Sequence, residues 1–351
     1  MTAIDPSYQL LACQYLRDQL DALAREIRGI RKNEDIEPVH RARVASRRMR
    51  AAMRMFEDCF SSKPFDKWRK RVRNLTKGLG AARDLDVQIE FVETFLEGLD
   101  RKDRKHRPGI NRLLLRLRQH RDAVQPRVLK TVDALEEDYA LAEMHGELAK
   151  ILFTLRGRDV KVQSPFVFQQ AAAHIGARKH DLLANEETLA DAEDVKGHHR
   201  LRIAAKRLRY TMEMCDPVYG GQLGSPIKAV KRLQSLLGDI HDCDVWGENI
   251  QVFMDGERLR ATNYYGHPRP FNRLKPGLLM LLDERKLHRE QTFAALLAYW
   301  ERITGDQIWE DLDTLLQSHA AALRAPEAKR ESENQPADAT DEEVNESSPG
   351  Q

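Results

Sequence analysis

Two short segments of the sequence carry basic side chains at helical spacing, with no acidic residue among them. On a helical wheel of about 100° per residue, the bases of the first segment fall within an arc of roughly 80°. They are His40, Arg43, Arg47, Arg50 and Arg54. The second segment forms the corresponding row of His199, Arg202, Lys206 and Arg209. Because like charges three or four positions apart on a helix repel, such rows indicate a multivalent anion, or carboxylates on a neighbouring helix, as their partner.

Further cations extend both rows. Arg48 and Arg207 are next to row residues in the sequence. The helix that follows each row adds more bases on one face, at spacings of three, four or seven residues. These bases are Lys70, Arg73 and Lys77 after the first row, and Lys228 and Lys231 at matching places after the second. Packing of each such helix beside its basic row predicts a concave cationic surface, to which both halves of the chain contribute.

Four carboxylates offer a different partner for part of this surface. They are Asp84, Asp86, Asp242 and Asp244. Ion pairs with these residues would neutralise some arginines within the protein, and such pairing stays open as an alternative for part of each row. Four carboxylates are too few to neutralise both rows, so the sequence still predicts a net cationic site.

The histidines do not have the neighbours that metal binding or catalysis requires. A metal site on a helix needs further ligands at i+3 or i+4, but Arg43 and Val44 hold those places after His40. The pair His241-Asp242 resembles the dipeptide of metal-dependent phosphohydrolases, whereas the first half has Arg83-Asp84. No phosphate-binding loop, nucleophilic triad or cluster of catalytic carboxylates is found. We expect no metal, no cofactor and no enzymatic activity, with a metal-dependent phosphohydrolase as an alternative.

The basic rows belong to an internal repeat. The segment HRARVASRRMR beginning at His40 recurs as HRLRIAAKRLR beginning at His199. A second motif, LGAARDLDV from Leu79, recurs as LGDIHDCDV from Leu237 at nearly the same separation. Two unrelated motifs that return in the same order predict a duplication, with the first repeat over residues 5–157 and the second over 163–323.

The elements that position these residues are predicted to be helices throughout. In the first half we expect helices over residues 6–32, 37–60, 64–79 and 84–99, with Gly80 ending the third, and then 109–155 with a possible break at Pro126. In the second half we expect 165–189, 194–215, 226–237 and 242–254, a loop over 255–276, and helices to 323. The predicted fold is all-α, with two antiparallel four-helix-type bundles related by a pseudo-twofold axis.

Composition agrees with a helical protein that has no disulfide framework. The chain has 351 residues, 57 Lys+Arg against 55 Asp+Glu, and 41% hydrophobic residues. No apolar run approaches the roughly 20 residues of a membrane span, and the N-terminus does not resemble a signal peptide. The four cysteines form no Cys-x-x-Cys pair, which favours a reducing cytoplasmic setting. Residues 325–351 contain eight acids and two bases, so we predict a disordered acidic tail.

The paired motifs resemble those of the CHAD family, whose name stands for conserved histidine α-helical domain. The resemblance rests on His-x-x-Arg-Val/Ile-x-x-Arg/Lys-Arg-x-Arg followed by Leu-Gly-x-x-x-Asp-x-Asp-Val in each half, and it covers residues 5–323. It implies two helical bundles, a central cavity, and binding of inorganic polyphosphate by histidines and basic residues. Many relatives carry an N-terminal triphosphatase domain of the CYTH type, marked by Glu-x-Glu-x-Lys. We find no such motif and expect a stand-alone binding domain.

Several expectations follow from the rows and the resemblance together. The ligand is expected to be inorganic polyphosphate, bound by the row residues and the added cations named above, with location at polyphosphate granules and contact with granule proteins. Because the rows contain no Trp and have few aromatic residues beside them, stacking with bases is disfavoured. A nucleic-acid binder or scaffold that uses the same rows stays an alternative, and no membrane partner is expected. We also expect the acidic tail to compete for the cationic surface.

Overall fold

The computed structural model describes residues 4–60, 62–137 and 139–319. The predicted acidic tail lies outside the described residues. Within these ranges the chain forms helices and turns without a β-strand, so the prediction of the all-α class is confirmed. The first half contains α1 (Pro6–Lys32), α2 (Glu37–Met55), α3 (Ser62–Glu97), α4 (Arg107–Glu137) and α5 (Ala140–Gly157).

The second half follows the same order of helices. It contains α6 (Pro165–Leu183), α7 (Val195–Cys215), α8 (Gly224–Tyr265) and α9 (Lys275–Gly305), followed by a last helical stretch over residues 308–319. Single turns of 3-10 helix connect some of these elements: η1 (Glu57–Cys59), η2 (Arg101–Asp103), η3 (Glu186–Ala190) and η4 (Arg269–Arg273).

Helices α3 and α8 are longer than the sequence predicts. We expected Gly80 to end a helix, but α3 continues through it, and α8 continues through Gly238 and through the first half of the predicted loop. A glycine inside a helix costs roughly 1 kcal/mol relative to alanine. Here the flanking Leu79 and Ala82 are fully buried, and this packing outweighs the low helix propensity of Gly80.

The predicted break at Pro126 is also absent, because Pro126 lies inside α4. An internal proline costs about 3 kcal/mol, since it removes a backbone hydrogen bond. The turns after it keep their apolar face in the core, where Val128 and Val132 are completely buried. Burial of this face keeps the helix continuous. The second helix, in contrast, is shorter than predicted and ends at Met55 instead of residue 60.

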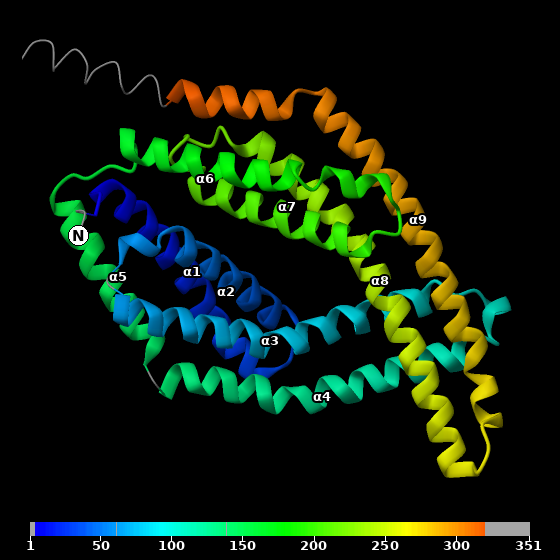
Figure 1. The fold of residues 1–351 in the computed structure, drawn as a ribbon. Helices are drawn as coiled ribbons and strands as arrows, with labels where there is room; N and C mark the ends of the chain where they lie inside the picture. The colour runs from blue at the N-terminus through cyan, green and yellow to red at the C-terminus, as the bar shows by residue number, and fades with distance from the viewer. Residues whose placement is uncertain (1–3, 61, 138, 320–351) are drawn as a thin grey trace, which may run out of the picture.

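The two halves meet through helices that occupy matching places in each. Helix α1 contacts α6, α2 contacts α7, and α4 contacts α9. Figure 1 shows α6 and α7 lying along α1 to α3, while α8 and α9 run steeply across the far ends of α3 and α4. This arrangement places the two basic helices, α2 and α7, at the centre of the molecule. A common origin of the halves by duplication stays a prediction.

The apolar residues form two clusters. The larger one joins α1, α2, α5, α6 and α7 with the first halves of α3 and α8, the later parts of α4 and α9, and the last helical stretch over residues 308–319. The smaller one lies where α3 and α8 end and α4 and α9 begin, and it includes Ile110, Ile250 and Leu278, each completely buried. The second cluster holds the long ends of α3 and α8 in place. Together the two clusters support the polar centre of the molecule from both sides.

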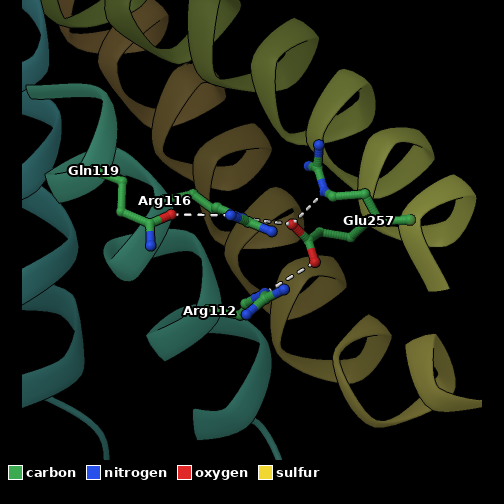
Figure 2. Close-up of polar contacts among 5 residues, drawn as sticks. Arg112, Arg116, Gln119 and Glu257 are labelled. Atoms are coloured by element: carbon green, nitrogen blue, oxygen red, sulfur yellow. Dashed lines mark hydrogen bonds and ion pairs between the residues drawn. The ribbon is translucent and has the colours of Figure 1, made fainter. Parts of the chain in front are cut away.

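A buried carboxylate joins α4 to α8 beside the smaller cluster. Glu257 is only 3% exposed, and its oxygens accept hydrogen bonds from Nε of Arg112 at 2.9 Å and Nε of Arg116 at 3.0 Å, as Figure 2 shows. Arg260 of α8 adds a third at 2.9 Å. Although burial raises the pKa of Glu257, the arginines outweigh it and lower that pKa below the ordinary value. Glu257 therefore stays ionised and joins the two halves.

Two glycines allow the first turns of α4 and α9 to touch. A Cβ at Gly109 would fall on the carbonyl oxygen of Leu274, and a Cβ at Gly277 would fall on the carbonyl oxygen of His106. In both cases the obstacle is backbone, which cannot move aside as a side chain would. The close contact of the two halves at this point therefore depends on glycine.

Replacing Gly277 with alanine is expected to lower the free energy of unfolding by about 1–3 kcal/mol or more, because the added methyl group overpacks the α4–α9 contact. Chemical denaturation measures the change. The matched control is Gly146→Ala in α5, where nothing lies within 4 Å of the added Cβ; this change is expected to be neutral or stabilising by roughly 0.5–1 kcal/mol. Equal effects of the two substitutions would contradict the close contact.

Candidate functional site

A large polar cavity lies between the two basic helices. Its volume is about 1340 Å³, and residues of α2, α3, α6, α7, α8 and α9 line it. Among the described residues, ten Lys and Arg side chains line the cavity against three carboxylates, which gives this part of the lining a formal charge of +7 when histidines are counted as neutral. The rows that the sequence places on separate helices therefore face one shared space.

Half of the predicted site residues line this cavity. They are His40, Arg43, Arg47, Arg50 and Arg54 from α2, and Arg202, Lys206 and Arg207 from α7. Among the described residues, no carboxylate forms an ion pair with Arg47, Arg50, Arg54, Arg202, Lys206 or Arg207. The charge of these side chains is therefore available to a ligand.

Arg43 and Arg202 occupy matching places and have matching surroundings. Each passes over the glycine of the second repeated motif, with Arg43 Nη2 3.9 Å from the Cβ position of Gly80 and Arg202 Nε 4.0 Å from that of Gly238. The Nε atoms of both arginines are buried without a hydrogen-bond partner. Burial lowers the pKa of both guanidinium groups below the ordinary value. Since a buried donor without a partner is costly, this pair is prepared to bind an anion.

The pKa of Lys206 is strongly lowered by its surroundings in the cavity. Burial and the cations Arg47, Arg202 and Arg207 lower the pKa of its ammonium group from 10.5 to about 8. Burial also lowers the pKa of Arg54, and Arg50 and Arg207 lower it further. The crowding of cations in the empty cavity is therefore unfavourable, and a polyanion would relieve it.

Carboxylates of the second repeated motif pair either with a row arginine or with arginines outside the rows. Asp84 pairs with Arg43, with 3.4 Å between Oδ1 and Nη2. Asp86 and Asp244, the second aspartates of the repeated motif, pair instead with arginines outside the rows, Arg121 and Arg289, each at 2.6 Å. The alternative of internal pairing thus applies to Arg43 but leaves most of both rows unpaired.

Asp242 lies in the cavity with Asp239. Burial raises the pKa of both carboxyl groups, and nearby Arg202 lowers that of Asp242 in part. These two carboxyls and Asp84 are the acidic members of the lining.

Two predicted site residues form ion pairs with one carboxylate of α7 instead of lining the cavity. Arg48 of α2 lies 3.1 Å from Glu213 of α7, and Arg209 of α7 lies 3.3 Å from the same carboxylate. The prediction that these two arginines face the ligand is therefore corrected. Glu213 follows the acid-free segment on α7, so its pairing with α2 depends on the contact between the halves.

The cations predicted from the third helix of each half are also outside the cavity. Lys70, Arg73, Lys77, Lys228 and Lys231 are all exposed and do not line it. The cavity borders α3 at Thr76 and from Arg83 to Phe91, and it borders α8 from Asp239 onwards. Because both helices continue past their glycines, their later turns face the cavity.

The two predicted histidines differ in position. His40 lines the cavity, whereas His199 is exposed and does not line it. The ring of His199 lies 5.0 Å from that of His241, which does line the cavity. His198, next to it, is buried and its Nε2 lies 3.2 Å from the carbonyl oxygen of Thr188.

Sequence reasoning missed several basic residues of the lining. They are Arg83, His174, Arg178, His241, Arg285 and His288. A third motif that occurs in both halves lies on α9, the helix that supplies Arg285 and His288. Arg-Pro-Gly-Ile at the start of α4 corresponds to Lys-Pro-Gly-Leu at the start of α9, and His120-Arg121 corresponds to His288-Arg289. Comparison of these segments would have matched α9 with α4, but it could not have placed α9 in the cavity.

The surroundings of three of the cavity histidines, His40, His174 and His241, disfavour the protonated ring. Burial and Arg83 lower the pKa of His40, burial and Arg178 lower that of His174, and burial and Arg202 lower that of His241. His174 also has a fixed partner, because its Nε2 lies 3.1 Å from the hydroxyl of Tyr8, which donates to the carbonyl oxygen of Met55. A bound polyanion would favour the protonated form of each ring.

Anion binding is therefore expected to strengthen as pH falls. His40, His174 and His241 each have a lowered pKa. An anion that raises the pKa of these rings is bound together with protons, so affinity increases as pH drops through about 6.5 and below. Above about pH 8 affinity falls, because Lys206 loses its charge. We expect about a tenfold gain in anion affinity for each pKa unit by which the ligand shifts one group.

Titration calorimetry in buffers of different ionisation enthalpy, at constant ionic strength, measures both the affinity and the proton uptake. Lys206→Arg keeps its charge at high pH and should remove the fall in affinity above pH 8. An affinity that rises with pH, or binding without proton uptake, would contradict this expectation.

The rest of the described chain shows no further chemical centre. Among these residues, no group of three or more His, Cys, Asp or Glu is placed to hold a metal ion. The four cysteines are free and buried. No helix within the described ranges has the length and apolar character needed to cross a membrane.

Comparisons with known proteins agree with this architecture. An uncharacterised protein of Mycobacterium tuberculosis, found in two strains, is 26% identical over 247 residues, which cover 66% of this chain. The match spans only 43% of the length of these curated relatives.

Two solved structures share the fold. The crystal structure of the CHAD domain from the plant Ricinus communis aligns with a TM-score of 0.54 and 23% identity, covering 83% of this chain and 91% of that one. PptA from Streptomyces chartreusis aligns with a TM-score of 0.54 and 16% identity, covering 85% and 100%. The family model for the CHAD domain matches residues 14–251, more than half of the sequence, and the chain belongs to the CHAD domain family.

Proposed function

We propose that this protein binds inorganic polyphosphate in the cavity between α2 and α7. The observation that carries the proposal is the matched pair Arg43 and Arg202, which line one cationic space and whose Nε atoms are buried without hydrogen-bond partners. Polyphosphate is a flexible chain with about one negative charge per phosphate. It supplies many acceptor oxygens and releases condensed counterions when it binds to a row of cations.

The aromatic residues of the lining favour phosphate over nucleic-acid bases. Binders of single-stranded nucleic acid present open aromatic faces on which bases stack. Here Trp246 and Tyr210 are only 6% exposed, and the guanidinium of Arg285 covers the ring of Phe91 at 4.2 Å. These rings are packed against the protein. A chain of phosphates, which has no bases to stack, fits such a lining better.

Competition between polyanions tests the proposal. Long-chain polyphosphate labelled with a fluorophore is titrated with the protein in about 0.1 M salt, and unlabelled single-stranded DNA or polyphosphate of equal total charge is added. Polyphosphate should displace the probe at far lower concentration than DNA. Equal displacement would favour the nucleic-acid alternative and overturn specificity for polyphosphate.

We further propose that the site binds without catalysis and that the protein associates with polyphosphate granules through it. Release of inorganic phosphate from polyphosphate, with and without Mg²⁺ or Mn²⁺, tests the first part, and steady release would support the phosphohydrolase alternative. Co-sedimentation with isolated polyphosphate granules tests the second. The granule fraction should lose the protein when soluble polyphosphate is added in excess.

A further inference from the structure

Lys206 is the single primary amine among the described residues that line the cavity. The other strong bases of the lining are arginines, and the matching place on α2 holds Arg47. The two amino acids differ in chemistry as well as in shape. A guanidinium group stays protonated in proteins and is a poor nucleophile, whereas a lysine amine becomes a nucleophile when it loses its proton.

The surroundings of Lys206 favour the neutral amine. Its side chain is half-buried, and four arginines that lower its pKa line the same cavity: Arg47 and Arg54 from α2, and Arg202 and Arg207 from α7. No carboxylate of the described residues forms an ion pair with it. Desolvation and like charges both disfavour the ammonium form. With a pKa of about 8, roughly a tenth of the amines are neutral at pH 7, against less than a thousandth for an ordinary lysine.

The same four guanidinium groups would attract small phosphate-bearing molecules. An acyl phosphate, the mixed anhydride of a carboxylic acid and phosphoric acid, combines a dianionic group with an electrophilic carbonyl carbon. The cationic cavity would concentrate it next to the amine, whereas an exposed lysine has no such group of cations around it. We propose that Lys206 is a modification site at which acyl phosphates acylate the cavity, an inference that rests on the proposed binding of phosphates there.

The reaction balances without any further reagent. The lone pair of Nζ attacks the carbonyl carbon, the bond from that carbon to the phosphate oxygen breaks, and inorganic phosphate leaves. The amine loses one proton to solvent, and the product is a neutral amide. No oxidant, reductant or metal is required.

Acylation would regulate the proposed function of the same cavity. The amide carries no charge at any pH and is larger than the amine it replaces. It removes one of ten Lys and Arg charges from the lining and fills part of the space between α2 and α7. Modified protein should therefore bind polyphosphate more weakly, and bound polyphosphate should protect Lys206 from modification.

Mass spectrometry of the full-length protein treated with acetyl phosphate tests the inference. Occupancy of acetyl groups at Lys206 is followed over time against Lys77 and Lys228, which are exposed and outside the cavity. We expect Lys206 to react about tenfold faster or more at pH 7.5, and long-chain polyphosphate to slow Lys206 alone. Arg47→Lys should introduce a second reactive amine at the matching place.

An uncharged acetyl donor, the N-hydroxysuccinimide ester of acetic acid, separates recruitment from simple reactivity. The preference for Lys206 over Lys77 should be larger with acetyl phosphate than with the ester, and an equal preference would overturn recruitment by the cavity. A rate at Lys206 equal to that at Lys77 would overturn the inference. In that case labelled polyphosphate, titrated separately, still decides whether the proposed function stands.

Discussion

Simultaneous replacement of Arg43 and Arg202 by alanine is expected to abolish most polyphosphate binding while leaving the protein folded. Each arginine lines the cavity and has a buried Nε without a hydrogen-bond partner. A hydrogen bond from such a guanidinium group to an anion contributes about 1.5–3 kcal/mol. Loss of both should weaken binding by about 100-fold or more. Fluorescence titration with labelled polyphosphate measures the affinity, and circular dichroism monitors the helices.

The control for this experiment removes the same charge from outside the cavity. Lys70 and Lys228 occupy matching places in the two halves, are exposed, and do not line the cavity. The double substitution Lys70→Ala with Lys228→Ala is expected to change affinity only slightly, because exposed charges are screened in about 0.1 M salt. Equal losses in the two double variants would show that net charge alone drives binding. Loss of the helical signal in the arginine variant would assign those residues a structural role.

Replacement of Arg121 by alanine is expected to cause the largest loss of stability. Arg121 joins three elements: its Nε donates to Asp86 at 2.6 Å, Nη1 to Gln125 at 2.8 Å and Nη2 to Asn33 at 3.1 Å. The side chain of Asp86 is 1% exposed, so removal of its partner leaves a buried charge unpaired. Breaking such a pair costs about 3–5 kcal/mol, which chemical denaturation at neutral pH measures.

The pH dependence of the loss distinguishes the buried pair from simple loss of packing. Burial already raises the pKa of Asp86, and Arg121 opposes this, so the variant should raise that pKa further. A carboxyl group with a higher pKa in the folded state than in the unfolded state gains stability as pH falls between the two values. The deficit of Arg121→Ala relative to the wild type should therefore shrink as pH is lowered toward about 4.

An exposed ion pair provides the matched comparison. Lys150 lies 2.7 Å from Glu147 one turn away on α5, and both side chains are largely exposed. Lys150→Ala is expected to change stability by less than about 1 kcal/mol. A loss of this small size for Arg121→Ala, or a deficit that does not change with pH, would contradict the role assigned to Arg121.

The acid-free rows could be predicted because they depend on local geometry alone. The spacing of His40, Arg43 and Arg47 places them on one face of any α-helix, whatever packs against it. The same holds for Arg202 and Lys206, and the repeated motifs identify the family from the sequence. The all-α class follows from composition and periodicity in the same way.

Local sequence could not predict that helices continue through Gly80 and Pro126, or that Arg48 pairs with a carboxylate of the other half. Gly80 and Pro126 are helix breakers by propensity, yet the burial of Leu79 and Val128 beside them keeps α3 and α4 continuous. Arg48 belongs to a basic segment but pairs with a carboxylate of the other half. For Gly80 and Pro126, packing outweighs an unfavourable helix propensity of about 1–3 kcal/mol. For Arg48, an ion pair with the other half decides where the side chain lies.

By itself, the sequence determined which side chains share a helix face, because side chains three or four positions apart lie on the same face of any α-helix. Only the tertiary structure decided that the two rows enclose one cavity, that Arg178 and Arg285 join it, and that Lys70 and Lys228 do not. These outcomes depend on where α3, α6, α8 and α9 pack, and that packing is set by apolar burial over the whole chain. The two basic rows are thus local in origin, whereas the full set of charges that line the cavity, and its shape, are properties of the complete fold.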